Sequence, residues 1–279
     1  MRAVGSGSRT EPARPGATVA PVNPTPARTA RPEAADGTPP ELFRPTWHAR
    51  SGRLTDRKRR ALDDLAVQHA VRLGSDDPAE GRAGIALEIG AGTGEAALAL
   101  AAARPRLLVV AAEVHKASLA RLLLDLDDSG VTNLRVAAGD GRAVLAALTP
   151  PPAGPDRPAL ELLRVFFPDP WPKRRHHGRR LVDAGFVTLA AQALRPGGLF
   201  ELATDHGPYA AAMRAAVGSC SGFGPADGPV RADRPVTYYE RRALEAGRAV
   251  HDLRHRRLDA AVTDEPGTPP GAPPGAPWT

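Results

Sequence analysis

The chain has 279 residues, including 30 prolines and 28 glycines that are too unevenly distributed for the whole length to pack around one core. Lysine and arginine number 37 against 31 aspartates and glutamates, and the resulting formal charge of +6 is a mild excess that identifies no partner by itself. The single cysteine, Cys220, excludes an internal disulfide and a zinc site built on a cysteine cluster.

Both ends of the chain differ in composition from the middle. Residues 1–50 are rich in Ala, Pro, Thr, Gly and Arg without hydrophobic periodicity, and residues 261–279 are rich in Pro and Gly. Because neither segment can bury enough apolar surface to offset the entropy lost on ordering, we predict two disordered tails around one domain at 51–260. No stretch approaches the roughly 20 apolar residues that span a bilayer, and no signal-peptide pattern is recognisable, which favours a cytoplasmic protein without a membrane partner.

Short apolar runs alternate with helix-forming segments along the predicted domain. Strands are predicted at 85–89, 107–114, 134–138, 160–167 and 199–204, and helices at 95–103, 115–128 and 182–194. This alternation implies βαβ units, and therefore an α/β fold with a doubly wound, mostly parallel sheet that has helices on both faces. Since such sheets bind ligands beyond the carboxyl ends of their strands, the residues that follow each strand are the candidate site.

A glycine-rich turn follows the first predicted strand. Gly90, Gly92 and Gly94 have a G-x-G-x-G spacing, which lets the backbone approach a ligand and directs helix N–H groups toward it. A tight strand-to-helix connection would have the same glycines. Glu88 lies in the strand that leads to the turn, and Glu113, at the end of the second strand, is placed to accept hydrogen bonds from both ribose hydroxyls of an adenosine.

Two features bear on which nucleotide cofactor the turn would bind. Nicotinamide cofactors favour a G-x-G-x-x-G spacing, which differs from the spacing in this chain. Asp140 follows the third strand, where a carboxylate can accept a hydrogen bond from the exocyclic amine of adenine. The same residue is equally suited to cap a helix that begins near Ala143.

The fourth predicted strand leads into the sequence Phe-Phe-Pro-Asp-Pro-Trp-Pro-Lys at residues 166–173. Asp169 stands between two prolines that restrict its backbone, and Trp171 offers a flat face to a planar ring. A rigid loop with a structural tryptophan is the alternative. Basic residues continue to Arg180, and two further basic clusters lie at 57–60 and 254–257, so that together they favour a polyanionic partner.

These segments, with Ala-Thr-Asp at 203–205 and Arg-Pro-Val-Thr at 234–237 followed by Glu240, resemble the tRNA (guanine-N7-)-methyltransferase family of bacteria. The match spans about residues 52–257, and its most specific parts are the Asp-Pro-Trp segment and the late Thr-x-x-Glu. The resemblance implies a Rossmann-like class I methyltransferase fold with S-adenosyl-L-methionine as cofactor. It also implies transfer of a methyl group to N7 of a guanine in tRNA, in the variable loop.

The resemblance further implies roles for individual residues. The implied cofactor contacts are Glu88, Gly90, Gly92, Gly94, Glu113, Asp140 and Asp169. The implied substrate contacts are Lys173, Asp205, Thr237, Tyr238, Tyr239 and Glu240. The implied RNA contacts are Arg175, His176, His177, Arg179 and Arg180. The chain departs from the family at Tyr238-Tyr239, where Lys-Phe is usual, and at Ala91, Gly178 and Ala243, where an aromatic, a basic residue and a glycine are common.

The chemistry of this reaction requires little of the protein beyond positioning. Guanine N7 carries an in-plane lone pair and no proton, so its attack on a methyl sulfonium requires no general base. Positive charge develops on the purine, and a carboxylate such as Asp169, the predicted catalytic residue, or Asp205 would stabilise it. Glu240 or Asp205 can accept from the N1–H and N2 amine of guanine, and Tyr238 and Tyr239 can stack on an exposed base, although both tyrosines equally suit core positions.

Three other functions agree with parts of the sequence. An RNA-binding protein without turnover would keep the fold, and the change at Tyr238-Tyr239 is its support. A small-molecule methyltransferase would require an apolar lid over the cofactor, and a nicotinamide-dependent reductase would use the same glycine turn. We predict no metal site, tRNA as the partner, and a monomer in preference to an oligomer.

Overall fold

The computed structural model describes residues 54–71, 79–149, 159–228 and 234–259. The predicted tails at 1–50 and 261–279 lie outside the described residues, so the domain limits stay a prediction. No helix in the described ranges is both long and apolar enough to cross a membrane.

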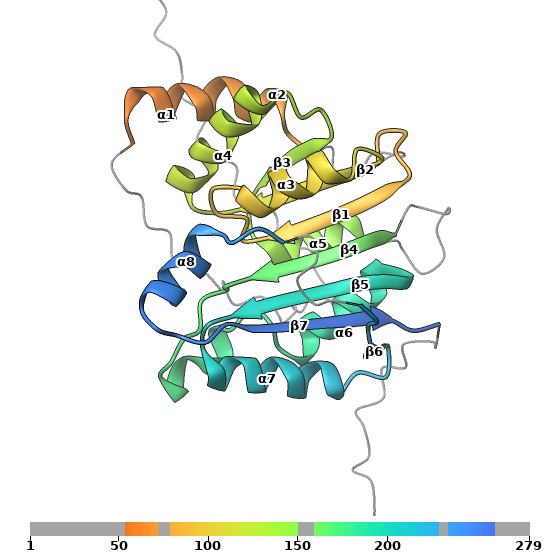
Figure 1. The fold of residues 1–279 in the computed structure, drawn as a ribbon. Helices are drawn as coiled ribbons and strands as arrows, with labels where there is room; N and C mark the ends of the chain where they lie inside the picture. Colours follow the sequence, from red (N-terminus) through yellow and green to blue (C-terminus); the bar gives the residue numbers. More distant parts are fainter. Residues whose placement is uncertain (1–53, 72–78, 150–158, 229–233, 260–279) are drawn as a thin grey trace, which may run out of the picture. The chain divides into compact units, whose positions relative to one another are not determined.

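Seven strands form one sheet in the order β3-β2-β1-β4-β5-β7-β6 (Figure 1). The strands are β1 (Gly84–Ile89), β2 (Leu107–Glu113), β3 (Leu134–Ala138), β4 (Leu160–Phe166), β5 (Leu194–Thr204), β6 (Phe223–Pro225) and β7 (His251–Arg257). The pairs from β3 to β5 are parallel, and β7 is antiparallel to both β5 and β6. The predicted α/β fold with a doubly wound, mostly parallel sheet is therefore confirmed, and the chain reverses its direction of winding between β1 and β4.

Helices cover both faces of the sheet. An N-terminal helical stretch consists of α1 (Asp56–Arg60), η1 (Ala61–Leu65) and α2 (Ala66–Gln68). The later helices are α3 (Glu95–Ala103), α4 (Lys116–Ser129), α5 (Gly141–Leu148), the 3-10 helix η2 (Arg174–Arg179), α6 (Ala184–Ala193), α7 (Gly207–Gly218) and α8 (Tyr238–Glu245). The expected helices at 95–103, 115–128 and 182–194 are α3, α4 and α6, within two residues at each end.

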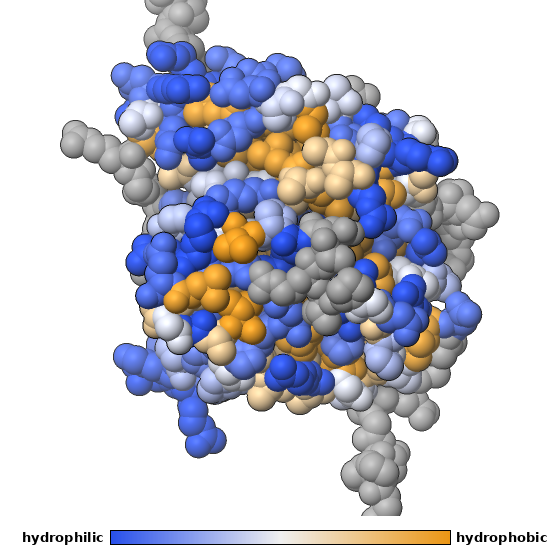
Figure 2. Space-filling view, viewed as in Figure 1, coloured by the Kyte–Doolittle hydropathy of each residue, from blue (hydrophilic) through white to orange (hydrophobic). Residues whose placement is uncertain are grey.

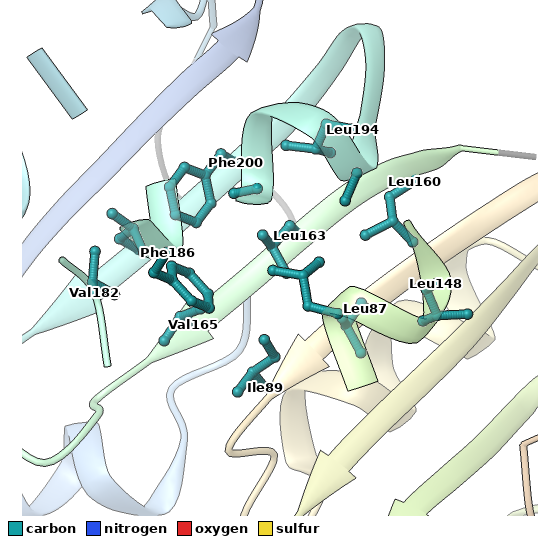
Figure 3. Packing of buried hydrophobic residues seen from close by; sticks show 14 of the residues in the cluster. Leu87, Ile89, Leu148, Leu160, Leu163, Val165, Val182, Phe186, Leu194 and Phe200 are labelled. Atoms are coloured by element: carbon teal, nitrogen blue, oxygen red, sulfur yellow. The ribbon is translucent and has the colours of Figure 1, made fainter. Parts of the chain in front are cut away.

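Alternate residues of the buried strands pack into two different layers. In β1, Leu87 and Ile89 contact the layer that contains α5, α6 and α7, whereas Ala86 contacts the layer that contains α3 and α4. Figure 3 shows the first layer, in which the rings of Phe186 and Phe200 lie near β4 with their centroids 6.2 Å apart. Because side chains of a strand point alternately to opposite faces, a continuous apolar run is what a sheet covered on both faces requires.

The fifth strand begins earlier than expected. We predicted a turn at 195–198 and a strand from 199, but β5 starts at Leu194, which pairs with Leu160. The next register pair is Leu162 with Leu199, so the Arg-Pro-Gly-Gly segment forms a bulge within the strand, with Gly197 at a φ of +78°. The glycine supplies the left-handed backbone that the bulge requires, and the chain resumes pairing after it.

Candidate functional site

A cavity of about 590 Å³ lies at the carboxyl ends of β1, β2, β3 and β4. Its walls are formed by the residues that follow these strands: Ile89, Gly90, Ala112, Glu113, Val114, His115, Gly139, Gly141, Phe166, Phe167, Pro168, Asp169, Pro170, Trp171 and Pro172, with Leu181 and Tyr239. Small-molecule sites typically have volumes of about 300–1,000 Å³. The cavity has this size, and it lies where the winding of the sheet reverses, which is the usual ligand position of such folds.

The glycine turn has the backbone that its sequence requires. Gly90, Gly92 and Gly94 have φ values of +73°, +58° and +83°, in the left-handed region that side chains disfavour. A Cβ on Gly94 would lie 2.1 Å from Cδ1 of Leu122, whereas no described atom lies within 4 Å of a Cβ built on Gly90. Gly94 therefore permits close packing of α4 on the turn, and Gly90 leaves space on the cavity side.

Glu113 ties this turn to the end of β2. Its Oε2 accepts a hydrogen bond from the main-chain N–H of Gly92 at 2.7 Å. Its Oε1 accepts from the N–H groups of Val114 and His115 at 2.8 and 2.7 Å. The buried carboxylate lines the cavity and holds the main chain on two sides of it.

Asp140 caps helix α5. Its Oδ1 accepts hydrogen bonds from the main-chain N–H groups of Arg142 at 2.8 Å and Ala143 at 3.4 Å. The capping role that the sequence allowed is thus present, and the contact with a cofactor stays a prediction. The neighbouring Gly139 and Gly141 both line the cavity, so the side chain begins at its edge.

Glu88 is buried beneath the glycine turn. Burial raises the pKa of its carboxyl to about 7, although the nearby Arg164 and Arg234 lower it. Its Oε2 has no hydrogen-bond partner among the residues that the structure describes. A small pocket of about 20 Å³ lies here, lined by Glu88, the turn and Thr237, and this space adjoins the main cavity through the shared Gly90.

A row of alternating charges crosses the sheet from Glu88. Arg164, Glu201 and Arg254 are its successive register partners on β4, β5 and β7. Glu201 accepts from Nε of Arg164 at 2.8 Å and from Nε of Arg254 at 3.1 Å. The row brings positive charge close to Glu88 and so limits the rise in its pKa.

This row corrects one expectation about the basic clusters. We expected residues 254–257 to contribute to a polyanion-binding surface, but Arg254 is bound to Glu201. Arg256 donates to the carbonyl of Gly197 at 3.1 Å, and Arg257 donates to that of Ala191 at 2.7 Å. The arginines of β7 therefore bind groups on neighbouring elements and stabilise the fold. The sequence alone does not distinguish such arginines from arginines on the surface.

The segment that follows β4 is held in an unusual conformation. Phe167 and Trp171, on either side of Pro-Asp-Pro, have positive φ values of +51° and +42°. Such backbone costs about 1–3 kcal/mol at each residue and persists only where the surroundings enforce it. Here Arg180 donates from Nε to the carbonyl of Pro170 at 2.9 Å, and the N–H of Phe167 donates to the carbonyl of Ala203 at 2.8 Å. Asp169, at the centre of this segment, is exposed and lines the cavity.

The predicted RNA-contacting residues follow this segment in η2 and divide into two groups. Arg175, His177 and Arg179 are exposed, as is Lys173. The guanidinium of Arg179 lies over the ring of Trp171, 5.1 Å from its centroid, and His176 meets that ring edge-on at 5.8 Å. Arg180 is buried, with its guanidinium 4.7 Å from the centroid of the Tyr209 ring. Arg180 is therefore placed to hold the loop, while its neighbours present their charge to solvent.

Helix α8 contributes one residue, Tyr239, to the wall of the cavity. Tyr239 lines the cavity, and burial together with the nearby carboxylates of Glu113 and Asp169 raises the pKa of its hydroxyl. Oγ1 of Thr237 is buried and finds no hydrogen-bond partner within the described part of the chain. Tyr238 is about half exposed, and Figure 2 shows apolar surface near this helix, where Val236 and Leu244 are also exposed.

Two predicted substrate residues are bound in ion pairs and do not line the cavity. Glu240 is fully buried, and its Oε2 accepts from Arg234 at 2.7 Å. Arg234 also donates to Asp252 at 2.5 Å. Asp205, directly after β5, accepts from Nε of Arg248 at 2.7 Å. The structure thus brings Gly90, Glu113, Asp169 and Tyr239 around one cavity, with Glu88 and Gly92 in the small pocket beside it. Asp205 and Glu240 are instead held in ion pairs near α8.

Glu95 and Arg234 join α8 to the rest of the site, although the sequence pattern gave no role to Glu95 and offered Arg234 only as part of the Arg-Pro-Val-Thr motif. Glu95 is the first residue of a helix, where an acid is common because it interacts favourably with the helix dipole. Its bonds to Tyr238 and Arg241 of α8 have no local signal in the sequence. Across the described ranges, no group of three or more His, Cys, Asp or Glu side chains is placed to hold a metal ion.

Known proteins are similar to the chain over most of its length. Residues 82–253 match a family described as putative methyltransferase. The tRNA (guanine-N(7)-)-methyltransferase of Nitrosococcus oceani is 37% identical over 227 residues, which are 78% of this chain and 94% of that protein. The protein of the same name from Halorhodospira halophila is 40% identical over 223 residues, 76% of this chain and 94% of that protein. The one from Mycolicibacterium gilvum is 40% identical over 229 residues, 75% of this chain and 84% of that protein.

Proposed function

The chain belongs to the tRNA (guanine-N7-)-methyltransferase family, and on that premise we propose that it transfers a methyl group from S-adenosyl-L-methionine to N7 of a guanine in the variable loop of tRNA. One observation carries the proposal beyond family membership. Asp169 is exposed into the same cavity that the glycine turn lines, and exposed basic residues begin four residues later at Lys173. An acid, a nucleotide-type turn and a cationic surface therefore meet at one place.

The residues of the cavity fit this cofactor. Gly90 leaves space on the ligand side, and Glu113 ends β2 in the cavity wall, where a carboxylate accepts hydrogen bonds from ribose hydroxyls. Asp140 follows β3 between two glycines that line the cavity, where a carboxylate can accept from an adenine amine. Oε2 of Glu88 is a buried acceptor, and leaving such a group without a donor costs about 1–3 kcal/mol. When bound, S-adenosyl-L-methionine supplies an electrophilic methyl group on a sulfonium.

Asp169 acts on the guanine through its charge. N7 of guanine attacks with its own lone pair, so the carboxylate abstracts no proton. It stabilises the positive charge that spreads over the purine during transfer, by up to about 4 kcal/mol at ~4 Å with an effective dielectric near 20. Before transfer the positive charge lies on the sulfonium, so the interaction lowers the barrier to the extent that the carboxylate lies nearer to the purine than to the sulfur. The two left-handed residues around the Pro-Asp-Pro segment keep the carboxylate at the cavity in the free protein.

The guanine enters between this loop and α8. Trp171 and Tyr239 both line the cavity, and stacking of a base on an aromatic ring contributes about 1–3 kcal/mol, which offsets the cost of removing it from RNA structure. Thr237 precedes α8 and lines the small pocket that adjoins this cavity. Asp205 and Glu240, predicted as substrate contacts, lie outside the cavity lining, and each is bound by an arginine.

The exposed cations bind the tRNA backbone. Lys173, Arg175 and Arg179, with His177, are exposed and directly follow the cavity-lining segment that ends at Pro172. Contacts of this kind contribute affinity that falls with salt and little sequence information. The choice of one guanine therefore depends on tRNA shape and on the fit of the base.

Transfer of labelled methyl groups tests the proposal. Incubation of the protein with tritium-labelled S-adenosyl-L-methionine and bulk tRNA is expected to put label into RNA, and borohydride reduction with aniline cleavage is expected to cut at one guanine in the variable loop. Cofactor and tRNA binding without label transfer would identify an RNA-binding protein that lacks turnover. Cleavage at a guanine elsewhere in tRNA would contradict the variable-loop assignment alone.

A further inference from the structure

Glu95, the first residue of α3, binds α8 through both oxygens of its carboxylate. Oε2 accepts from the main-chain N–H of Tyr238 at 2.5 Å, and Oε1 accepts from Arg241 at 2.6 Å. Arg241 also donates to the carbonyl of Val236 at 2.7 Å, so that it spans the start of the helix. The partners lie 143 and 146 residues beyond Glu95, and this contact therefore joins the two distant parts of the chain that form the cavity.

The position of this carboxylate suits the ends of two helices. Glu95 is the first residue of α3, and Tyr238 is the first residue of α8. The first N–H groups of a helix have no partner within it and carry partial positive charge. One carboxylate thus stabilises the start of α3 and satisfies the first N–H of α8, while Arg241 balances its charge.

The segment that Glu95 holds carries the predicted substrate residues. Thr237 immediately precedes α8, and Tyr239 is its second residue. A Cβ on Gly92 would lie 3.6 Å from Cε2 of Tyr239, so this ring sits directly against the glycine turn. Elsewhere, Glu240 of α8 is paired with Arg234, which also binds Asp252 of β7. Arg248, just after α8, is paired with Asp205, just after β5. Glu95 adds an anchor on the glycine-turn side.

We propose that Glu95 is a positioning residue that holds Thr237 and Tyr239 against the glycine turn, so that a bound guanine is aligned with the methyl donor. The inference rests on the proposed function, because alignment matters only if both ligands occupy the cavity. Glu95 contacts the site through α8 and touches neither ligand in this role. Its removal leaves the cofactor residues in place and loosens the side of the cavity that receives the base.

Three variants test the proposal: Glu95→Ala, Arg241→Ala and the double variant. Arg241→Ala removes the ion pair and the exposed bond to the carbonyl of Val236 but keeps the bond from Tyr238 to Glu95, and the KM for tRNA is expected to rise about two- to fivefold. Glu95→Ala removes the ion pair and the bond from Tyr238, so a rise of about tenfold with a lower kcat is expected. The double variant is expected to lie within about twofold of Glu95→Ala, since the ion pair is already lost and only the exposed bond to Val236 is removed in addition. The Kd for S-adenosyl-L-methionine is expected to change less than about twofold. A general loss of folding would instead weaken cofactor binding as well.

A matched control lies at the amino end of β4. Glu161 is paired with Arg195, and the side chains of that pair are 26% and 47% exposed, against 35% and 47% for Glu95 and Arg241. Glu161→Ala is expected to leave the KM for tRNA unchanged. The charge swap of Glu95→Arg with Arg241→Glu is expected to recover part of the loss that either substitution causes alone.

Hydrogen exchange separates this proposal from the proposed function. Amides of α8 are expected to exchange at least about fivefold faster in Glu95→Ala than in the unmodified chain, whether or not the protein methylates tRNA. Unchanged exchange in α8, or tRNA KM values in Glu95→Ala and Arg241→Ala equal to that of Glu161→Ala, would overturn the positioning role. An unmodified chain that transfers no methyl group, with α8 exchange still dependent on Glu95, would overturn the proposed function and with it the alignment of guanine.

Discussion

The two walls of the cavity are held by different kinds of interaction. The first wall, here called the cofactor wall, consists of the glycine turn at 90–94 with Glu113 and Asp140. Their carboxylates bind main-chain N–H groups in the turn, just after β2 and at the start of α5. The second wall, here called the substrate wall, consists of residues 166–173 and α8. It is held by side chains that do not line the main cavity themselves, such as Arg180 on Pro170 and Glu95 on α8.

This difference predicts how each wall responds to substitution. In the cofactor wall, the same groups bind the main chain and face the ligand, so most changes alter folding and cofactor binding together. In the substrate wall, Asp169 is exposed while other residues fix its loop, so its chemistry can be changed with the fold intact. The predictions below, in order of decreasing effect, test that division.

Asp169→Asn is expected to have the largest effect on turnover. The amide keeps the shape of the side chain but loses the charge that stabilises the methylated purine, and kcat is expected to fall by about 10²–10³-fold. The Kd for tRNA is expected to stay within about twofold, because the exposed cations are unchanged. Single-turnover assays and filter binding measure the two quantities, and near-normal turnover would remove Asp169 from the mechanism.

Gly94→Ala is expected to unfold the cofactor wall. A side chain there has an unfavourable φ of +83°, and its Cβ would lie 2.1 Å from Leu122, so the free energy of unfolding is expected to fall by about 3 kcal/mol. Gly90→Ala is the control, since its φ of +73° is also unfavourable but its Cβ meets no described atom within 4 Å. Its loss is expected to be about 1 kcal/mol, with weaker cofactor binding. Urea unfolding of both variants measures the difference, and equal losses would refute the packing explanation.

Glu88→Gln is expected to change the pH dependence of stability. Burial raises the pKa of Glu88 from 4.5 to about 7 in the folded protein, so the fold favours the neutral acid. This contribution to stability is fully present below about pH 4.5 and is lost as the pH rises through about 7. Relative to the unmodified chain, the variant is expected to gain about 2–3 kcal/mol between about pH 5 and pH 8. Denaturant unfolding at the two pH values measures this gain, and parallel pH profiles would show that Glu88 is ionised in the fold.

The sequence predicted the cofactor wall well because its parts are local. Helix α3 was expected at 95–103 and is found there, and the glycines and acids follow strands whose apolar runs are continuous. The position of each residue relative to a strand end was enough to place it near the cavity. The alternatives at Asp140 could not be separated in this way, since a helix cap and a cofactor contact require the same location.

The sequence did not predict how the substrate wall is assembled. Strand β7 has Leu253 as its one aliphatic residue among charged and polar ones, so it lacks the pattern of a buried strand. Its charges are satisfied by β5, which lies about 50 residues earlier, and no local rule connects the two. Glu240 was predicted to contact the substrate, but it is buried against Arg234. Arg234 in turn binds Asp252 of β7, and the sequence does not show that these three residues meet.

The smallest effect on tRNA binding is expected from the substitution of a single cation in η2. This substitution tests whether an exposed arginine contributes more to RNA binding than an arginine that is bonded within the fold. Arg175 is exposed, so Arg175→Ala is expected to weaken tRNA binding about fivefold at low salt. It is also expected to reduce the slope of log K for tRNA binding against log salt concentration by about one, because one phosphate contact is lost.

Arg256→Ala is the control. It removes a cation that is bonded to the carbonyl of Gly197, so the salt slope is expected to stay unchanged while the free energy of unfolding falls by about 1 kcal/mol. A titration of tRNA binding across salt concentrations measures both variants. Equal slopes for the two would mean that the position of a cation on the surface does not control RNA binding, whereas different slopes would place the RNA against η2, which follows the substrate wall in the chain.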